Sequence, residues 1–497
     1  MTTRQLRIAA VIGVALFLSY AYFYPAGGWN QNSRFALIRA ILERHTLQID
    51  DYQLHTGDRA LWRDHYYTDK APGASLVALL PVQAARLAAR AAGVDPASLP
   101  GIAWTSYVAG VVTSGLFTVI AALCVFWLAL RWGASDGAAL FAAAAYGLAT
   151  PAWAYATLFL GHGQTAGCLM VALVAADLIG DLAEAPEARR RMAWIIGLAG
   201  GWAVVTEFQA AIPAVFIGLF ALARLKPSRD SDADDRSVTA SAGHWAVVAR
   251  IALGVTMAAV PLLAYNTLAF GSPFHLGYAS EEGFKELHTG FFGITYPKLS
   301  TIRELLVGSY RGLLPLSPLI GVVPLGLWLL GRTERRAAAL VAAGTGVYYL
   351  LLNASYFYWE GGWAFGPRQM TAALPFLALG LAPLWDFGRP AGRALLFAGF
   401  VWGAAVTLVG VSTTPQPPAS IKAPVRELLW PAFRDGDLSL NPQTFVHNSV
   451  DVATLRGGGE PHAAWNLGEL AGLRGLPSLL PLLVIWVVAA GLLRLLL

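Results

Sequence analysis

Charged residues are scarce in this sequence: Asp, Glu, Lys and Arg together make up 13% of its 497 residues. A soluble globular domain has about a quarter of its residues charged, so an ordinary soluble fold is excluded. Hydrophobic residues account for 56% instead. They occur in blocks of roughly 17 to 25 residues, the length that crosses a bilayer as a helix, without the alternation of a membrane barrel. The composition predicts an all-α polytopic membrane protein.

Cysteine is also nearly absent, because only Cys124 and Cys168 are present and both lie inside apolar blocks. This excludes a disulfide framework and a thiolate metal site. The formal net charge of +5 could attract nucleic acid, but the basic residues lie in short loops between the apolar blocks. That distribution is the positive-inside pattern of membrane proteins, so we expect no nucleic-acid partner.

The apolar blocks predict about twelve transmembrane helices, with both chain ends on the cytoplasmic side of a cell membrane. The first block follows Arg4 and Arg7 and lacks a small-residue cleavage motif, so we expect it to be retained rather than removed as a signal peptide. The predicted spans are residues 8–24, 104–130, 136–155, 163–180, 193–206, 208–223, 247–266, 313–331, 337–352, 370–386, 393–411 and 477–496.

The block at residues 75–94 has two interpretations. It is apolar enough to cross, but Arg86 and Arg90 lie four residues apart and share one helical face. If it crossed, the arginines at 189–191 and 332–336 would become external, against the positive-inside bias. We therefore predict an amphipathic helix in the membrane interface. The polar stretch before it, residues 25–73, then forms a large first external loop.

Two polar segments interrupt the predicted membrane core, residues 1–411. The small, polar, mixed-charge stretch at residues 226–243 predicts a disordered cytoplasmic linker, within residues 224–246. Residues 412–476 contain PQPP, NPQ and GGGEPH and few apolar clusters, which predicts a small external, loop-rich segment. Residues 477–497 follow as the last transmembrane helix.

Polar residues that are unusual in a membrane protein gather on the external side in this topology. They are Asp50, Asp51, Tyr67, Asp69 and Lys70 in the first loop, and His162, Glu207, Arg311, Glu360 and Arg368 in later segments. Acidic groups at membrane depth are costly and are usually paired or functional. Arg311 and Arg368 have a structural alternative as snorkelling end residues, and Glu360 as a partner of Arg368 alone.

These side chains suit a substrate that is part lipid, part phosphate and part sugar. A phosphate leaving group gains negative charge as its bond to the sugar breaks, so cations should surround it. Lys70, Arg311 and Arg368 are the candidates. The attacking hydroxyl needs a base, for which Asp or Glu is a common choice, and the external carboxylates supply several.

Two segments of the first external loop carry a family resemblance. They are RFALIRAILERHTLQID and HYYTDKAPG, in which the motif positions are occupied by Arg34, Phe35, Ala36, Asp50 or Asp51, Tyr67, Asp69, Lys70 and Pro72. The loop resembles that of the family 39 glycosyltransferases, GT-C type membrane enzymes that include protein O-mannosyltransferases and the lipid A aminoarabinose transferase. SYRGLLPLSP and WEGGWAFGPRQM look like segments of bacterial members. The resemblance is clear over residues 29–73 and looser over the remaining membrane core.

The resemblance implies a GT-C-like helical bundle and an inverting transfer of a sugar from a polyprenyl-phosphate carrier to a lipid, glycan or protein acceptor at the external face. It places the base in the first loop. Where the family has its leading acid, this chain has Gln31 and Asn32, whose amides cannot act as bases at neutral pH. Either Asp50 or Asp51 then serves as the base, or the chain is a divergent relative that binds carrier lipid without this chemistry.

Asp69 and Lys70 are expected to orient the donor phosphate. A divalent metal could bind Asp50 and Asp51, but a monophosphate offset by Lys and Arg does not require one, so we predict no cofactor. A transporter or flippase for a lipid-linked glycan would also need a charged amphipathic cavity. Transporters more often show repeat symmetry and broken helices near the midplane, and a non-catalytic scaffold is the third alternative.

Overall fold

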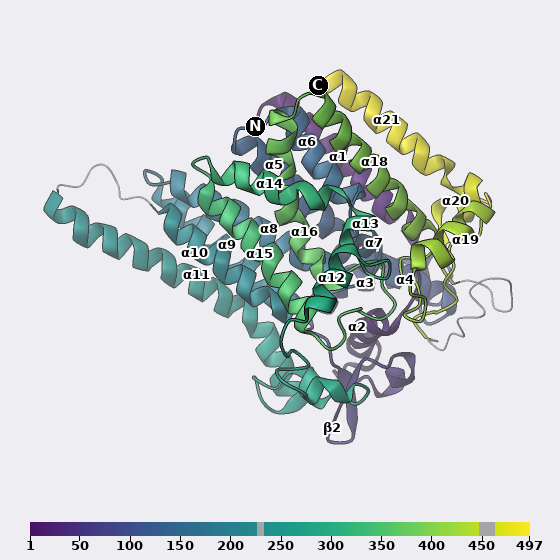
Figure 1. The fold of residues 1–497 in the computed structure, drawn as a ribbon. Coiled ribbons are helices and arrows are strands. Elements are labelled where there is room, and N and C mark those ends of the chain that lie inside the picture. Colours follow the sequence, from purple (N-terminus) through teal and green to yellow (C-terminus); the bar gives the residue numbers. More distant parts are fainter. Residues whose placement is uncertain (226–232, 447–462) are drawn as a thin grey trace.

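The computed structural model describes residues 1–225, 233–446 and 463–497, and in these ranges the protein is a bundle of helices (Figure 1). Within them, eight helices are long and apolar enough to cross a membrane. These are α1 (Thr3–Ala21), α4 to α5 (Leu99–Arg131), α8 with η4 (Gly161–Asp181), the apolar part of α11 (His244–Phe270), α15 (Arg336–Ser355), η8 to α17 (Arg368–Phe387), α18 (Pro390–Thr413) and η11 with α21 (Leu476–Leu496). The protein is therefore an all-α, multi-pass membrane protein, as the composition predicts.

Several of these spans are built from more than one helical segment. The component segments are α4 (Leu99–Gly110), η3 (Val111–Gly115), α5 (Leu116–Arg131), α8 (Gly161–Leu178), η4 (Ile179–Asp181), η8 (Arg368–Ala373), α16 (Leu374–Ala378), α17 (Leu381–Phe387), η11 (Leu476–Leu479) and α21 (Leu480–Leu496). Shorter apolar helices and one helix with a basic start complete the bundle: α6 (Asp136–Leu148), η5 (Phe208–Ala210) with α10 (Ala211–Arg224), α14 (Leu319–Gly331) and α9 (Pro186–Thr206). Each of the twelve predicted spans overlaps one or more of these helices, whereas eight helices in the described residues are long and apolar enough to cross a membrane.

The span predicted at residues 136–155 is the main departure. Helix α6 ends at Leu148, and a separate short helix, α7 (Ala152–Thr157), follows. Pro151 lies between them, and proline disfavours helical geometry in the residue before it, so the first helix cannot run through. A short helix α13 (Leu313–Leu316) likewise precedes α14 across Pro318.

Small residues let α9 and α11 (Ala233–Phe270) pack closely. A Cβ atom added at Gly197 of α9 would lie 2.3 Å from the carbonyl oxygen of Ile251, and one added at Gly254 of α11 would lie 3.1 Å from the Cα of Gly197. Without a hydrophobic driving force between helices in lipid, such close backbone approach is a main source of helix association. Side chains at these positions would force the two helices apart.

The first external loop folds into short elements between α1 and the membrane core. It contains β1 (Phe23–Tyr24), α2 (Trp29–Arg39), η1 (Ala40–Arg44), η2 (Asp50–His55), β2 (Arg59–Trp62) and β3 (His65–Thr68). Strands β2 and β3 form an antiparallel hairpin in which Arg59 faces Thr68 and Trp62 faces His65. Helix α3 (Gly73–Ala91) comes next, where the sequence predicts the interfacial helix of residues 75–94.

The predicted linker and the last external segment differ in how they fold. Part of the linker, residues 226–232, lies outside the described residues, but α11 begins at Ala233, so the second part is helical rather than disordered. Adding residues to an existing helix is easier than starting one, and this stretch runs directly into the apolar part of α11. Residues 412–446 and 463–476 contain η9 (Val425–Leu429), α19 (Trp430–Asp435), β4 (Trp465–Asn466) and α20 (Leu467–Leu470).

The remaining short elements lie in the chain between α11 and α15. They are η6 (Gly277–Ser280), η7 (Lys285–His288) and α12 (Leu299–Val307).

Strand β4 pairs with β1, so the segment after α18 folds back onto the start of the first loop. The first loop and the segment after α18 therefore lie at one end of the bundle, the end with the β2 hairpin, away from the chain termini (Figure 1).

The opposite end of the bundle holds the termini and a buried ion-pair cluster. The Arg4 guanidinium donates to the backbone oxygen of Leu497 at 3.1 Å, which joins the two termini. Asp177 near the end of α8 has a side chain 1% exposed and pairs with Arg131 at 2.5 Å and with Arg335 at 3.5 Å. These basic residues belong to the loops that the sequence assigns to the cytoplasm. His162 at the start of α8 is 15 residues away, about 22 Å along the helix.

Removing the Asp177 carboxylate should destabilise the protein. The substitution Asp177→Asn leaves two arginines without their buried counter-charge, which costs about 3 kcal/mol. The free energy of unfolding, measured by denaturant titration in micelles, should fall by that amount. Asp181→Asn is the matched control, because the Asp181 side chain is 51% exposed although it also pairs with Arg131. An exposed pair contributes at most about 1 kcal/mol, and equal losses in the two variants would contradict this prediction.

Candidate active site

A buried ion pair joins the first external loop to the membrane helices. Arg34 of α2, which is 1% exposed, donates from Nη2 to Oε1 of Glu207 at the end of α9, at 2.7 Å. Its Nε donates to Oδ1 of Asn30 at 3.0 Å and its Nη1 to the carbonyl oxygen of Ala71 at 3.0 Å. A buried guanidinium needs this full set of acceptors. Arg34 thereby fixes both ends of the loop relative to α9.

Lys70 lies between two carboxylates just after β3. Its Nζ is 2.6 Å from Oδ2 of Asp69 and 2.8 Å from Oδ2 of Asp58, and the three side chains are almost buried. Burial raises the pKa of Asp69 to about 6. Burial lowers the pKa of Lys70, but the two carboxylates outweigh it, so the pKa of Lys70 lies well above its usual value. When all three groups are charged, the trio carries one net negative charge.

Two cavities of different chemistry meet beside this trio. The apolar cavity, of about 420 Å³, is lined chiefly by Ile212, Leu276, Leu287, Phe291, Phe292, Ile294, Leu352 and Phe357, with Asp69 and Lys70 among its polar residues. The polar cavity, of about 630 Å³, is lined by residues that include Trp29, Gln31, Trp363, Gln416 and Gln443. Asn30, Asp58, Tyr358 and Arg368 line both cavities. These four residues therefore form a shared wall.

Two side chains on these cavities lack hydrogen-bond partners. The Nε atom of Arg368 is buried without a partner, and in the described ranges of the chain its guanidinium forms no ion pair. Asn353 of α15 is fully buried, lines the apolar cavity, and has neither its amide nitrogen nor its amide oxygen paired. Unpaired buried polar groups are costly, so a ligand that satisfies them would bind favourably here.

The structure brings together half of the residues that the sequence singles out. Asp69, Lys70, His162, Glu207 and Arg368 all line the apolar cavity, although they come from four different segments. The Nδ1 atom of His162 lies 3.9 Å from Oε1 of Glu207. These five polar residues thus converge at one end of the bundle, as the predicted topology requires.

Asp50 and Asp51 lie elsewhere. Asp50 accepts a hydrogen bond from the backbone nitrogen of Tyr66 at 2.6 Å and pairs with His65 at 2.8 Å, while Asp51 pairs with Arg44 at 2.6 Å. Their side chains are 37% and 53% exposed, and neither lines the apolar or the polar cavity. The turn η2 places both carboxylates on the surface of the loop, Asp50 against the hairpin and Asp51 beside Arg44.

Three other predicted residues make contacts within the protein and line neither the apolar nor the polar cavity. Arg311 is fully buried and donates to the carbonyl oxygens of Glu360 at 2.8 Å and Gly362 at 2.6 Å. The Tyr67 ring packs against Phe270, with centroids 5.2 Å apart. Glu360 takes part in this site through its backbone, and across the described chain no ion pair joins it to Arg368. Arg311 therefore holds the loop that precedes Arg368.

Several cavity residues were not predicted. Asp58 is one of six acids between residues 43 and 69, and nothing in its local sequence distinguishes it from Asp50 or Asp51. Asn353 lies in an apolar helix, where a single amide side chain could in principle have been recognised from the sequence as a candidate site residue. Gln31 and Asn32 replace the family acid and have structural partners: Gln31 donates to Gln416 at 2.7 Å, and Asn32 to the carbonyl oxygens of His55 and Thr444 at 2.7 and 3.1 Å.

Comparison with known proteins gives a match at the level of structure. No protein-family model and no curated protein sequence matches this chain. A solved structure of ArnT from Cupriavidus metallidurans bound to undecaprenyl phosphate matches with a TM-score of 0.50 and 17% identity, covering 87% of this chain and 68% of that chain. The apo state of the same protein matches with a TM-score of 0.48 and 17% identity, covering 86% and 67%.

ArnT is the lipid A aminoarabinose transferase, a GT-C type enzyme. The match extends over most of this chain. The resemblance that the sequence of the first loop indicates is thus confirmed at the level of the fold. This protein has the fold of the GT-C type membrane glycosyltransferases.

Proposed function

We propose that this protein is an inverting glycosyltransferase that moves a sugar from a polyprenyl-phosphate carrier to an acceptor hydroxyl at the external face of the membrane. One observation supports this most: an apolar cavity and a polar cavity share a wall that holds an unpaired cation, Arg368, and a carboxylate, Asp58. A lipid-linked sugar needs both kinds of surface, and an acceptor must approach the same point from another side. Undecaprenyl phosphate, bound in the ArnT structure, is a polyprenyl-phosphate carrier without its sugar.

The donor would lie in the apolar cavity with its phosphate at the charged end. The prenyl chain would contact residues such as Ile212, Leu276 and Phe292. Lys70 already has two carboxylate partners, whereas the Arg368 guanidinium has none in the described parts of the chain. Arg368 is therefore the main cation for the phosphate, and it offsets the charge that develops as the bond from sugar to phosphate breaks. Asn353 would hydrogen-bond a polar group of the donor.

Asp58 is the base that the geometry favours over Asp50 and Asp51. An acceptor hydroxyl in the polar cavity would attack the anomeric carbon from the face opposite the phosphate, which inverts the configuration. The oxygen–carbon bond to the acceptor forms, the bond to the phosphate oxygen breaks, polyprenyl phosphate leaves, and the hydroxyl proton passes to Asp58. Lys70, 2.8 Å away, holds the Asp58 carboxylate in position on the shared wall. Such a base contributes about 10² to 10⁴ in rate.

The substitution Asp58→Asn should lower the transfer rate about a hundredfold or more, because an amide cannot accept the proton. Membranes containing the protein would be incubated with a panel of labelled polyprenyl-phosphate sugars, and the label would be followed from the carrier to its acceptor. Asp51→Asn is the matched control, since Asp51 pairs only with Arg44 on the loop surface. Full activity of Asp58→Asn together with loss in Asp50→Asn or Asp51→Asn would return the base to the pair that the sequence predicts.

Donor affinity should depend on pH through Asp69. Burial raises the pKa of this carboxyl to about 6, so it is protonated below that pH and ionised above it. Protonation changes the net charge of the trio of Asp58, Lys70 and Asp69 from −1 to 0, which removes repulsion of the anionic donor. The donor KM should be roughly fivefold lower at about pH 5 than at about pH 7.5. Asp69→Asn should show the low KM at both values, and a persistent pH dependence of KM in this variant would contradict the assignment.

The external position of the site can be tested by labelling single cysteines in intact cells. In a variant without Cys124 and Cys168, a cysteine at Asp51 should react with a membrane-impermeant maleimide. A cysteine at Arg190, near the start of α9, should react only after the cells are permeabilised. Positive-inside placement of the basic loops predicts this pattern. Labelling of Arg190→Cys in intact cells would reverse the orientation and move the site to the cytoplasmic face.

A further inference from the structure

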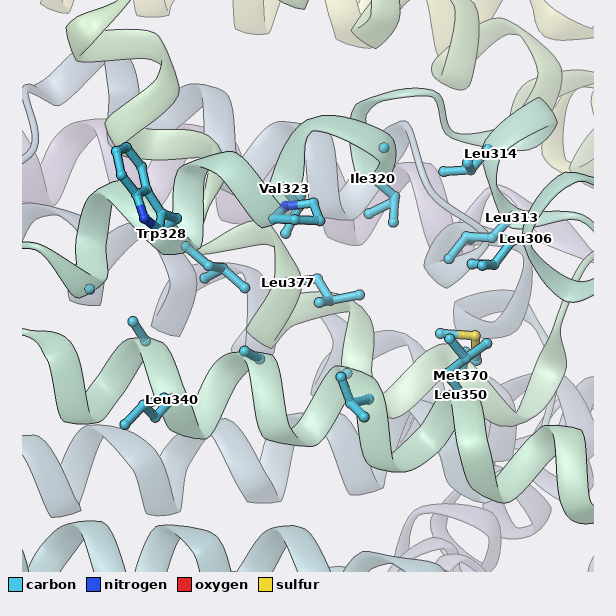
Figure 2. Close-up of a pocket in the computed structure, with 18 of the residues that line it drawn as sticks. Leu306, Leu313, Leu314, Ile320, Val323, Trp328, Leu340, Leu350, Met370 and Leu377 are labelled. Carbon is cyan, nitrogen blue, oxygen red and sulfur yellow. The ribbon is translucent and has the colours of Figure 1, made fainter. Parts of the chain in front are cut away.

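A third, larger cavity lies apart from the candidate active site. It is a groove of about 860 Å³ between α14 and α15, and it shares no lining residue with the apolar or the polar cavity. Figure 2 shows Trp328 and Leu340 toward one end of the groove and Leu306, Leu313 and Met370 toward the other. The groove is open at the side, since Trp328 is 53% and Leu340 is 63% exposed. In a membrane these side chains would face lipid.

The length of the groove matches one leaflet of a bilayer. Helix α14, which forms one wall, has 13 residues and is about 20 Å long. One leaflet of hydrocarbon is about 15 Å thick, half of the full apolar thickness. The lining is almost entirely aliphatic over this length. An acyl chain that enters beside Trp328 could therefore extend along the whole groove.

Charge is concentrated at one end of the groove. Its only charged lining residues are Arg332 and Arg336, which flank the turn between α14 and α15. The Arg332 guanidinium lies 4.7 Å from the centroid of the Trp328 ring. Neither arginine forms an ion pair with any described residue, whereas Arg335 between them pairs with Asp177 at 3.5 Å. Two cations without an ion-pair partner in the described residues thus lie at the mouth of the aliphatic groove.

We propose that this groove binds a phospholipid with a negatively charged headgroup. Its phosphate would lie between Arg332 and Arg336, and one acyl chain would fill the groove toward Leu313 and Met370. Each cation near a membrane surface contributes favourably to binding of an anionic lipid, while a zwitterionic headgroup gains less. The phosphate of the polyprenyl donor would lie elsewhere, because the arginines lie with Asp177 at the end of the bundle opposite Arg368 and Lys70.

The inference can be tested by native mass spectrometry of the full-length protein with equal amounts of phosphatidylglycerol and phosphatidylcholine. The wild type should retain phosphatidylglycerol preferentially, and the double substitution R332Q/R336Q should reduce that preference about tenfold. The matched control is R190Q/R191Q, which removes the same charge from the start of α9 and should keep the preference. Equal loss in both double variants would show that the preference is non-specific and would overturn the proposal.

A second variant tests whether the lipid's acyl chain lies in the groove. Ala343→Phe places a ring in the groove from α15 and should reduce retention of both phospholipids while leaving the two arginines in place. Unchanged retention in Ala343→Phe would contradict binding in the groove. The carrier's tail is the competing occupant: if decaprenyl phosphate displaces the bound lipid equally well from wild type and R332Q/R336Q, the groove holds a prenyl chain and the proposal is wrong.

Discussion

The contact on which the site depends is the buried pair of Arg34 and Glu207. Neither charge can be left alone in a low-dielectric interior, so the loop that carries Arg34 must dock where α9 ends. The remaining donors of Arg34 are taken up by Asn30 and the carbonyl of Ala71, which lie at the two ends of the folded loop. Docking in this position sets Asn30, Asp58 and Lys70 beside the cavities. The arrangement of the candidate active site is therefore a consequence of satisfying one buried guanidinium.

The requirement that a buried charge has partners also explains why the buried cations have different roles. Lys70 and Arg311 are both buried, and each is fully occupied, one by two carboxylates and the other by backbone carbonyls. They build the loops on either side of the site. Arg368 remains available because its neighbours offer it no acceptor in the described structure. An unpaired cation beside an apolar cavity is costly in the free protein, and the proposed anionic lipid donor would compensate that cost.

The two ends of the bundle perform different tasks. At the end with the termini, Asp177 of α8 joins Arg131 of α5 and Arg335 just before α15, and these charges neutralise one another and fix the helices. At the other end, charges are arranged around cavities and leave hydrogen-bonding capacity unused at Arg368 and Asn353. Unused polar capacity beside a cavity is available to a ligand. The groove between α14 and α15 also has cations without an ion pair in the described residues, Arg332 and Arg336, but these are exposed.

The sequence alone determined the class of fold, the approximate positions of most apolar helices, the polar first loop and the presence of Asp69, Lys70, His162, Glu207 and Arg368 at one end. These follow from hydrophobic length and from the alternation of loops across a membrane, which are local properties. Only the tertiary structure showed that Asp58 lines the two cavities while Asp50 and Asp51 do not, because the turn η2 and the hairpin set which carboxylate faces inward. It also showed that Gln31 binds Gln416, almost 400 residues away. Spacing along the chain cannot encode such contacts, since they depend on how distant segments pack.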